Sequence, residues 1–406
     1  MNRNIVICSD GTGNTFDRRV TNVTHLIKAL ALDDHLHQVV LYDQGVGTNA
    51  HRSTVVDTYR KGLADPSALT ILPAPLGSTF GPKAWFDRGR GLMTGHGLKE
   101  NVGQIYRALA EIYEGPGDRV FMFGFSRGAF TVRALAGLLY RCHLTPRGST
   151  DSEARFERAW RLYEPMLDDD DATRHFRTQQ RPCPVHFLGL WDTVKSYGGI
   201  DPVILPHLRH NPIVAHVRHA LALDERRAWF KPTTWGLLDS DRTGAMTRLK
   251  PEDRALFDAQ DIAEVWFSGC HSDIGGGARE ETTARIALRW MLGETLHVDP
   301  SVRLNREGKA LLATDDPPGP PQIHQSWNRR WALVEAMPRK EIDNSGTFPV
   351  KKAARGSDGQ RVPQALRRDA KVLLHDTVGN AVSISGDVEI RHTKSLPGEG
   401  HSAAPR

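Results

Sequence analysis

A serine between two glycines is the clearest chemical signal in this chain. Residues 120–129 read Val-Phe-Met-Phe-Gly-Phe-Ser-Arg-Gly-Ala, an apolar run that ends at Gly124 and is followed by Ser126 and Gly128. The run is typical of a buried strand, and the pattern after it, through Tyr140, is typical of a helix. The motif G-x-S-x-G between a strand and a helix predicts a sharp turn that lifts the hydroxyl off the sheet, beside the amide groups of a helix N-terminus. We therefore expect Ser126 to be a nucleophile with an anion site next to it.

A serine nucleophile needs a base that takes its proton and an acid that orients the base. Asp192 follows a strand-like run within Trp-Asp-Thr, and His271 follows another such run and precedes a glycine-rich loop. The chain order serine, aspartate, histidine is that of the α/β-hydrolases. We predict Ser126 as the nucleophile, His271 as the general base and acid, and Asp192 as the orienting carboxylate.

Other histidines and aspartates compete for these roles. The rival histidines are His25, His96 and His219. The rival carboxylates are Asp10, Asp201 and Asp273. Asp273 lies two residues after His271, where it could organise the glycine-rich loop or bind a metal together with that histidine.

Ester hydrolysis through a tetrahedral intermediate also requires hydrogen-bond donors for the oxyanion. The backbone N–H of Arg127, directly after the serine, is the first expected donor. The second should come from the loop after the first strand, where Gly11 or Thr12 fits because glycine lets the backbone approach closely. Asp10 would then be a supporting residue whose carboxylate accepts hydrogen bonds from loop amides, and Asp273 is a second supporting residue.

The elements that must position these residues alternate between strands and helices. Strands are expected at 4–9, 38–43, 118–124, 184–190 and 262–269. Helices are expected at about 20–32, 98–113, 128–141, 151–180 and 281–293. This alternation predicts an α/β fold, α/β-hydrolase-like, with a mostly parallel sheet covered by helices on both faces. Each candidate catalytic residue directly follows a strand, at the sheet edge where such folds bind ligands.

Two loop-rich stretches interrupt the pattern. They lie near 49–97 and 200–260 and are predicted as insertions in a catalytic domain that covers residues 1–296. Either insertion could form a lid that excludes water from an acyl site.

The last part of the chain, 297–406, is predicted as a small, irregular C-terminal extension. It contains a proline-rich linker at 315–321 and a segment at 371–391 that is typical of a small hairpin. From residue 395 onward it is rich in Gly, Ser, Pro and Ala, and we expect this end to be disordered.

The composition is that of an ordinary globular protein. The 406 residues are 39% hydrophobic and 25% charged, and no run of about 18 apolar residues suggests a membrane span. The N-terminal residues lack the features of a secretory signal. We therefore expect a soluble protein made in the cytoplasm. Four scattered cysteines without a C-x-x-C pair argue against a disulfide scaffold and structural zinc, and we expect no cofactor and no metal.

The formal net charge of +5 is modest, and most of the excess lies after residue 297. Such an excess is compatible with peripheral contact at an anionic lipid surface, although a solvated surface is the commoner meaning. No zinc, RNP or helix-turn-helix pattern supports a nucleic-acid role. The sequence gives no indication of the oligomeric state.

Six clusters together resemble a known family. They are Ser-Asp-Gly-Thr-Gly-Asn-Thr (9–15), Tyr-Asp-Gln-Gly-Val-Gly-Thr (42–48), Gly-Phe-Ser-Arg-Gly-Ala (124–129), Leu-Trp-Asp-Thr-Val (190–194), Arg-His-Ala-Leu-Ala-Leu-Asp-Glu-Arg-Arg (218–227) and His-Ser-Asp-Ile-Gly-Gly-Gly (271–277). In this order they resemble the catalytic domain of the type VI secretion phospholipase effectors and the broader, largely uncharacterised α/β-hydrolase family that contains it. The resemblance covers roughly 1–295.

The resemblance implies an α/β-hydrolase core and a lipase that cleaves phospholipid ester bonds. Carried over by motif, its triad is Ser126, Asp192 and His271. An effector of this kind would be exported by a route that does not use a signal peptide. The cluster at 218–227 is predicted as a helix end packed near the active site.

The leading hypothesis is therefore a serine esterase that forms an acyl-enzyme, with a lipid or another ester as its substrate. A second hypothesis is a metal-dependent phosphohydrolase in which Asp10 is the nucleophile and a hard cation is held by Asp192, Asp273 and His271. It lacks the second aspartate that such loops usually carry two residues later. A third is a binding protein without catalytic activity on a hydrolase scaffold.

Overall fold

The computed structural model describes most of the chain up to residue 315 and shorter pieces after it. The described residues are 3–11, 20–45, 60–72, 95–165, 170–194, 203–209, 211–227, 230–235, 249, 251–278, 281–315, 322–327, 331, 339–340, 350–351, 361, 372–378 and 388–392.

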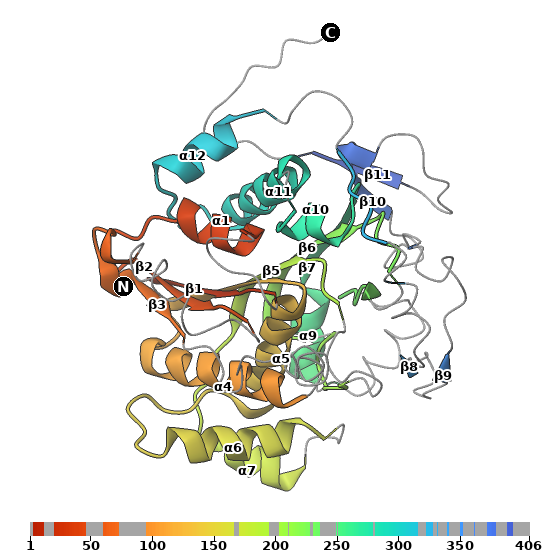
Figure 1. The fold of residues 1–406 in the computed structure, drawn as a ribbon. Helices are drawn as coiled ribbons and strands as arrows, with labels where there is room; N and C mark the ends of the chain where they lie inside the picture. Colours follow the sequence, from red (N-terminus) through yellow and green to blue (C-terminus); the bar gives the residue numbers. More distant parts are fainter. Residues whose placement is uncertain are drawn as a thin grey trace, which may run out of the picture.

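A nine-stranded sheet forms the centre of the molecule (Figure 1). Its order is β11-β10-β7-β6-β5-β4-β1-β2-β3, and every neighbouring pair is parallel. The strands are β1 (Arg3–Ser9), β2 (Gln38–Asp43), β3 (Leu69–Ile71), β4 (Asp118–Phe125), β5 (Val185–Trp191), β6 (Val214–Ala222), β7 (Asp261–Phe267), β10 (Val372–His375) and β11 (Val388–Arg391). Two further short strands, β8 (Arg339–Lys340) and β9 (Val350–Lys351), form a separate antiparallel pair.

Helices cover both faces of this sheet. The α-helices are α1 (Asn22–Ala29), α4 (Gly95–Ile112), α5 (Arg127–Cys142), α6 (Ser152–Tyr163), α7 (Asp171–Thr178), α9 (Pro251–Asp258), α10 (His271–Gly275), α11 (Thr282–Val298) and α12 (Arg306–Ala313). Two 3₁₀ turns, η2 (Pro66–Ala68) and η4 (Asp376–Val378), adjoin β3 and β10. In Figure 1, α1, α10, α11 and α12 lie above the sheet, and α4, α5, α6 and α7 lie below it. None of the helices among the described residues is long and apolar enough to cross a membrane.

The alternation of side chains along the strands explains why the core has two layers. In β1, Ile5 and Ile7 pack on the face that α4 and α5 cover. Val6 and Cys8 pack on the opposite face, against α1 and α11. Because both faces of the central strands are covered by helices, these strands are apolar almost throughout, as buried parallel strands usually are.

The strand order places the carboxyl ends of β1 and β4 at a switch point. From β1 the chain moves outward through β2 and β3, and then returns to the other side of β1 as β4. From β4 it moves in the other direction through β5, β6 and β7. Loops at such a point diverge and leave a crevice at the carboxyl edge. The predicted mostly parallel α/β fold with helices on both faces is therefore confirmed.

Two local predictions are wrong. Residues 218–222 belong to strand β6 and not to a helix end. Their pattern misled because the polar side chains of Arg218 and His219, which are buried and bind Glu294 and Glu264, interrupt the apolar run expected of a central parallel strand.

The predicted hairpin at 371–391 is also wrong, because β10 and β11 pair in parallel and not antiparallel. β10 extends the main sheet by pairing with β7, where Leu373 lies opposite Val265 and Leu374 opposite Trp266. A four-residue apolar strand carries no signal in its sequence for the direction of its partner.

The described parts of the predicted insertions and extension contribute to the main body. Within 49–97, residues 60–72 supply η2 and the edge strand β3, and most of the rest lies outside the described residues. Within 200–260 the structure describes β6 and most of α9. After residue 296, α12 packs against α1, and β10 and β11 extend the sheet. The sequence from 395 lies outside the described residues.

Candidate active site

The turn at Ser126 joins β4 directly to α5. Phe125 is the last residue of the strand and Arg127 the first of the helix, so the whole change of direction falls on one residue. Ser126 has φ 57° and ψ −119°, a conformation that costs a residue with a side chain about 1–3 kcal/mol. Its N–H donates to the carbonyl of Trp191 at 3.0 Å, which holds the strained turn against the end of β5.

The two glycines of the motif are required by close backbone contacts. A Cβ atom on Gly124 would lie 2.6 Å from the Cα of Ala129, and one on Gly128 would lie 2.1 Å from the carbonyl oxygen of Ser9. Both distances are far below van der Waals contact, and both neighbours are backbone atoms that cannot easily move. The glycines therefore let the helix start pack directly against its own strand and against the end of β1.

His271 is the first residue of α10 and lies over the serine. Its Nε2 is 2.8 Å from the Oγ of Ser126. The ring packs between Phe125, with centroids 4.6 Å apart, and Phe230, with centroids 5.0 Å apart. These contacts bury the imidazole and fix its plane.

Asp192 is fully buried on the other side of the imidazole. Its Oδ2 is 2.6 Å from the Nδ1 of His271. The residue follows β5 with φ 40°, its N–H donates to the carbonyl of Ala220, and its Oδ1 accepts the N–H of Ala222. The end of β6 therefore holds the aspartate.

The structure thus brings the three predicted residues into one hydrogen-bonded chain. A neutral imidazole that donates from Nδ1 to Asp192 has its Nε2 lone pair directed at the hydroxyl of Ser126. This tautomer can accept the serine proton, and the imidazolium that results would be stabilised by the carboxylate. The arrangement is able to perform nucleophilic acyl transfer.

The burial of the site sets the charge of both ionisable members. Burial lowers the pKa of His271 below its ordinary value, although the hydrogen bond and the charge of Asp192 act in the opposite direction. Burial alone would raise the pKa of Asp192, but Arg361 and His271 outweigh it and hold that pKa well below its usual range. Near neutral pH the site therefore holds a neutral base beside an ionised acid.

Sequence reasoning missed Arg361, which also binds the aspartate. Its Nη1 donates to Oδ1 of Asp192 at 2.5 Å, and its Nη2 donates to Oδ2 at 3.0 Å. It belongs to none of the six motif clusters, and it lies 169 positions after Asp192 in the sequence. No local pattern in the sequence could have identified it.

Glu225 supports the backbone of the histidine. Its Oε2 accepts the N–H of His271 at 3.2 Å, and its side chain is paired with Arg227 at 2.8 Å. Burial raises the pKa of Glu225, but Arg227 and His271 outweigh it and lower that pKa to about 2. Ser326 donates to the same carboxylate at 2.8 Å. This residue of the 218–227 cluster therefore helps to fix the start of α10.

Asp273 caps the start of α10, the helix that carries His271, whereas the sequence suggested a role in the following glycine-rich loop or in metal binding. It is buried, its Oδ2 accepts the N–H of Cys270 at 2.9 Å, and the same atom accepts the N–H of His324. Its Oδ1 also binds the ring of His324 at 2.5 Å. With both oxygens used in this way, Asp273 ties α10 to the segment at 322–327.

The expected oxyanion donors have different positions. Arg127 is the first residue of α5, so its N–H belongs to a helix N-terminus beside Ser126. The N–H of Gly11, in contrast, donates to Oδ1 of Asp10 at 2.7 Å, and in this arrangement it serves the aspartate. Thr12 lies outside the described residues.

Asp10 is enclosed by the loop after β1. Besides Gly11 it accepts a hydrogen bond from Thr21 at 2.8 Å and one from Tyr42 at 3.4 Å, and the residue is buried. These contacts fit the supporting role that the sequence predicted.

The rival residues are placed elsewhere or are outside the described part. His219 is buried, and both ring nitrogens are used, one with Glu264 at 2.7 Å and one as acceptor for the N–H of Thr193 at 3.1 Å. His25 pairs with Glu281 at 3.1 Å. The side chain of His96 and the whole of Asp201 lie outside the described residues.

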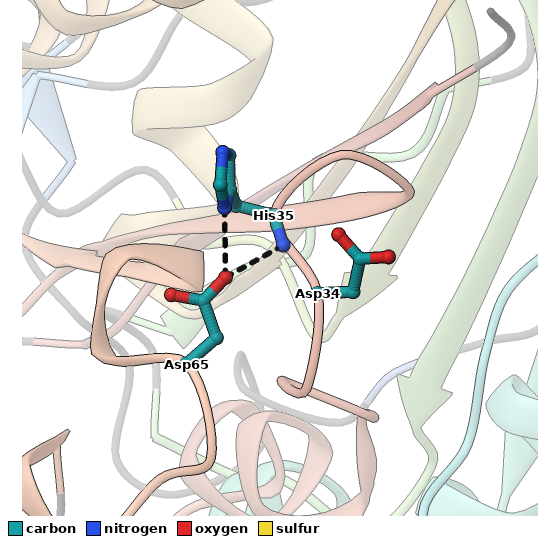
Figure 2. A group of neighbouring side chains, drawn as sticks. All are labelled: Asp34, His35 and Asp65. Atoms are coloured by element: carbon teal, nitrogen blue, oxygen red, sulfur yellow. Dashed lines mark hydrogen bonds and ion pairs between the residues drawn. The ribbon is translucent and has the colours of Figure 1, made fainter.

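Among the described residues, one group has ligand atoms close enough to hold a metal ion: Asp34, His35 and Asp65. Figure 2 shows His35 joined to Asp65 through both its ring and its backbone N–H. These residues precede β2 and β3, at the sheet edge opposite Ser126, and their oxygens already cap local turns. Within the described part of the chain, the phosphohydrolase hypothesis therefore has no cation site at Asp10.

Comparison with known proteins shows the family to which this chain belongs. The family model described as T6SS, phospholipase effector Tle1-like, catalytic domain matches residues 3–294. The uncharacterized protein YEL023C of Saccharomyces cerevisiae is 34% identical over 72% of this chain and 57% of its own length.

Two solved structures are also similar. An uncharacterized protein from Pseudomonas aeruginosa has a TM-score of 0.38 and 19% identity, over 75% of this chain and 47% of that chain. The Tle1 effector bound to the VgrG spike of the type 6 secretion system has a TM-score of 0.32 and 17% identity, over 68% of this chain and 51% of that chain. This chain therefore spans about half the length of the relatives it matches. Because the family match covers β1 to β7 and all three members of the Ser126 hydrogen-bond chain, the protein belongs to the Tle1-like phospholipase effector catalytic domain family.

Proposed function

We propose that this protein is a serine hydrolase that cleaves ester bonds of phospholipids or other lipid esters through an acyl-enzyme. The observation that carries the proposal is the hydrogen-bond chain from Ser126 through His271 to Asp192, with distances of 2.8 and 2.6 Å. Membership of a family named for phospholipase effectors supports the lipid ester as the substrate class.

The proposed reaction proceeds in two halves. Nε2 of His271 takes the hydroxyl proton as Oγ of Ser126 attacks the ester carbonyl, and the N–H of Arg127 donates to the oxyanion. Collapse of the intermediate breaks the bond to the alcohol, which leaves with the proton from His271. Water then attacks the acyl-serine with His271 again as the base, and the carboxylic acid and the free hydroxyl are released.

The surroundings of the imidazole favour an apolar substrate. Phe125 and Phe230 pack on His271, and Trp331 contacts Phe230 with ring centroids 5.6 Å apart. Phe125 is buried, but Phe230 and Trp331 are partly exposed and form an aromatic surface near His271 that an acyl chain can contact. We further propose that the protein meets its substrate by peripheral contact with a lipid surface.

Two measurements on the purified protein test the function. A fluorophosphonate probe is expected to label the wild type once, at Ser126, and a panel of phospholipids and soluble esters should identify a hydrolysed substrate. Ser126→Ala should abolish both signals with little change in stability, because the substitution removes one small hydroxyl. Ser149→Ala is the matched control, because that hydroxyl only donates to the carbonyl of Pro146.

Each alternative predicts a different result. A binding protein without activity would not react with the fluorophosphonate probe. A metal-dependent phosphohydrolase would also not react with the probe, and it would lose its activity when EDTA is added. Either pattern in the wild-type protein would contradict the proposal.

A further inference from the structure

Arg361 is a buried cation in the part of the chain that follows the family match. Only 7% of the residue is exposed, and the match ends at 294. Besides the two bonds to Asp192, its Nη1 donates to the carbonyl of Ala222 at 2.7 Å and its Nη2 to that of Phe230 at 2.5 Å. The guanidinium therefore joins three segments at the triad: the end of β5, the end of β6 and the turn at 230.

We infer that Arg361 is a positioning residue for catalysis, which fixes and neutralises Asp192 so that His271 can act as a base. The inference rests on the proposed function, since it assigns Arg361 a part in the same triad. It also means that a residue beyond the family match contributes to the active site.

Arg361 sets the plane of the Asp192 carboxylate. Oδ1 of Asp192 binds Nη1 of Arg361 and the N–H of Ala222, and Oδ2 binds Nη2 of Arg361 and Nδ1 of His271. A guanidinium offers two parallel N–H groups, so it sets the plane of the carboxylate as well as its place. Because Oδ2 is shared, the plane that Arg361 imposes also sets the direction in which His271 is held.

Arg361 also affects the net charge next to the imidazole. The charged groups that face His271 are Asp192 below it, Glu225 at its backbone, and Arg227, which stacks 3.6 Å from the centroid of Phe230. Glu225 is paired with Arg227, and Asp192 is paired with Arg361. With both carboxylates neutralised, burial dominates and the imidazole stays uncharged near neutral pH.

Loss of Arg361 would leave a buried carboxylate beside His271 with no second partner of opposite charge. The imidazolium form would then be favoured, and the pKa of His271 would rise. His219, which faces Asp192 from β6, already uses both ring nitrogens and its pKa is lowered by burial, so it does not replace the lost charge.

Two other residues after the family match contact side chains that support His271. Ser326 donates to Glu225, which holds the backbone of His271. His324 binds Asp273, which caps α10. Arg361, in contrast, binds Asp192 of the triad directly.

The test compares Arg361→Met and Arg361→Lys with the wild type, using the whole chain and a soluble ester. In Arg361→Met the acidic limb of the profile of kcat against pH is expected to move upward by about one pH unit. Its activity should recover as the pH rises, with little change in KM. In Arg361→Lys the positive charge remains, but the paired N–H groups of the guanidinium are lost. The acidic limb of the profile of kcat against pH should therefore stay near that of wild type, while the maximum value of kcat falls.

The matched control is Arg181→Met. Arg181 also places a guanidinium on backbone carbonyls, those of Ala110, Tyr113 and Thr145, and it touches no residue of the triad. Its loss should lower the free energy of unfolding without moving the acidic limb of the profile of kcat against pH. This result would separate general loosening of the fold from the effect of Arg361 on His271.

Two results would overturn the inference. One is a folded Arg361→Met whose acidic limb coincides with that of wild type, and the other is an Arg361→Lys with an unchanged maximum value of kcat. If Arg361→Met does not fold, the lysine variant alone decides.

Failure of the proposed function itself would appear as absent labelling of the wild type. In that case NMR titration of the His271 ring, assigned with His271→Gln, still measures the predicted rise in the pKa of His271. No change in that pKa in Arg361→Met would contradict the inference.

Discussion

Ser126 shows how one residue in an unfavourable conformation can be held ready for reaction. Its positive φ is maintained by the hydrogen bond to Trp191 and by the helix that starts at the next residue. The strain at this position is offset by the packing of two buried elements, so the hydroxyl need not reorganise before it meets His271. The packing of the fold therefore compensates for the backbone strain at Ser126, and the reaction gains a hydroxyl that is already in position.

Burial of His271 predicts an acidic limb at low pH. Because its pKa is lowered, the imidazole remains a base below the ordinary value of about 6.5. The profile of kcat/KM against pH for a soluble ester should therefore fall only below that value. Stability should decline over the same range, since the unfolded histidine binds a proton near pH 6.5 that the folded one resists. Circular dichroism at each pH separates the two effects, and a limb above 6.5 would contradict the assignment of His271.

At the scale of elements, three neighbouring strands hold Asp192 in place. β5 ends at Asp192, β6 provides Ala220, Ala222 and His219, and β7 provides Glu264. Glu264 binds the ring of His219, and that ring accepts the N–H of Thr193, the residue after Asp192. A buried polar pair in the sheet is thereby used to fix the loop that carries the acid.

His219→Leu tests this support. The change leaves the N–H of Thr193 without its acceptor and Glu264 without its partner on β6, which should cost about 3 kcal/mol of the free energy of unfolding. Labelling of Ser126 by the fluorophosphonate should also become slower, because the loop at Asp192 loosens. Urea unfolding and labelling rates measure the two effects.

His25→Leu is the comparison variant for that experiment. His25 forms a partly exposed pair with Glu281, and such pairs contribute less than about 1 kcal/mol. Equal losses of unfolding free energy and of labelling rate in the two variants would show that His219 has no specific role in supporting the loop at Asp192.

The elements that the sequence predicted well are those whose pattern is local. The strand before Ser126 and the helix after it follow from an apolar run, two glycines and a helical period. β6 was mistaken because Arg218 and His219 are buried with acidic partners from other elements, Glu294 and Glu264. In a sequence, the polar residues of a buried ion pair resemble exposed residues. Only the tertiary structure shows that each is paired with a residue from another element.

The same distinction applies to the site as a whole. Ser126, Asp192 and His271 could be chosen because each follows a strand and the order matched a known arrangement, and the structure brings them together. Arg361 could not be chosen, because a single arginine in a polar segment has no periodicity and no motif. Glu225 was named only within a cluster, since its contact is with the backbone of His271.

At the scale of the whole molecule, a chain that ends at residue 296 is expected to fail as an independent domain. Its loss of β10 exposes the edge of β7, and an unpaired edge promotes aggregation. The loss of Arg361 also leaves the buried carboxylate of Asp192 without its ion-pair partner, which should lower the free energy of unfolding by a further 3–5 kcal/mol, roughly. Size-exclusion chromatography and urea unfolding should show aggregated or unfolded protein.

The control for this truncation is a chain that ends at residue 392, which keeps every described element. It should behave as the full chain does. A monomeric, cooperatively folded 1–296 fragment would support the predicted boundary between a catalytic domain and an extension, and would contradict the dependence argued above.

The position of Arg361 along the chain also has a consequence for synthesis. Translation releases Ser126, Asp192 and His271 into the cell well before the guanidinium that pairs with Asp192. A nascent polypeptide thus carries its nucleophile before it obtains the counter-ion of its acid. Under the proposed function, the triad would gain its full support only once residue 361 had been synthesised.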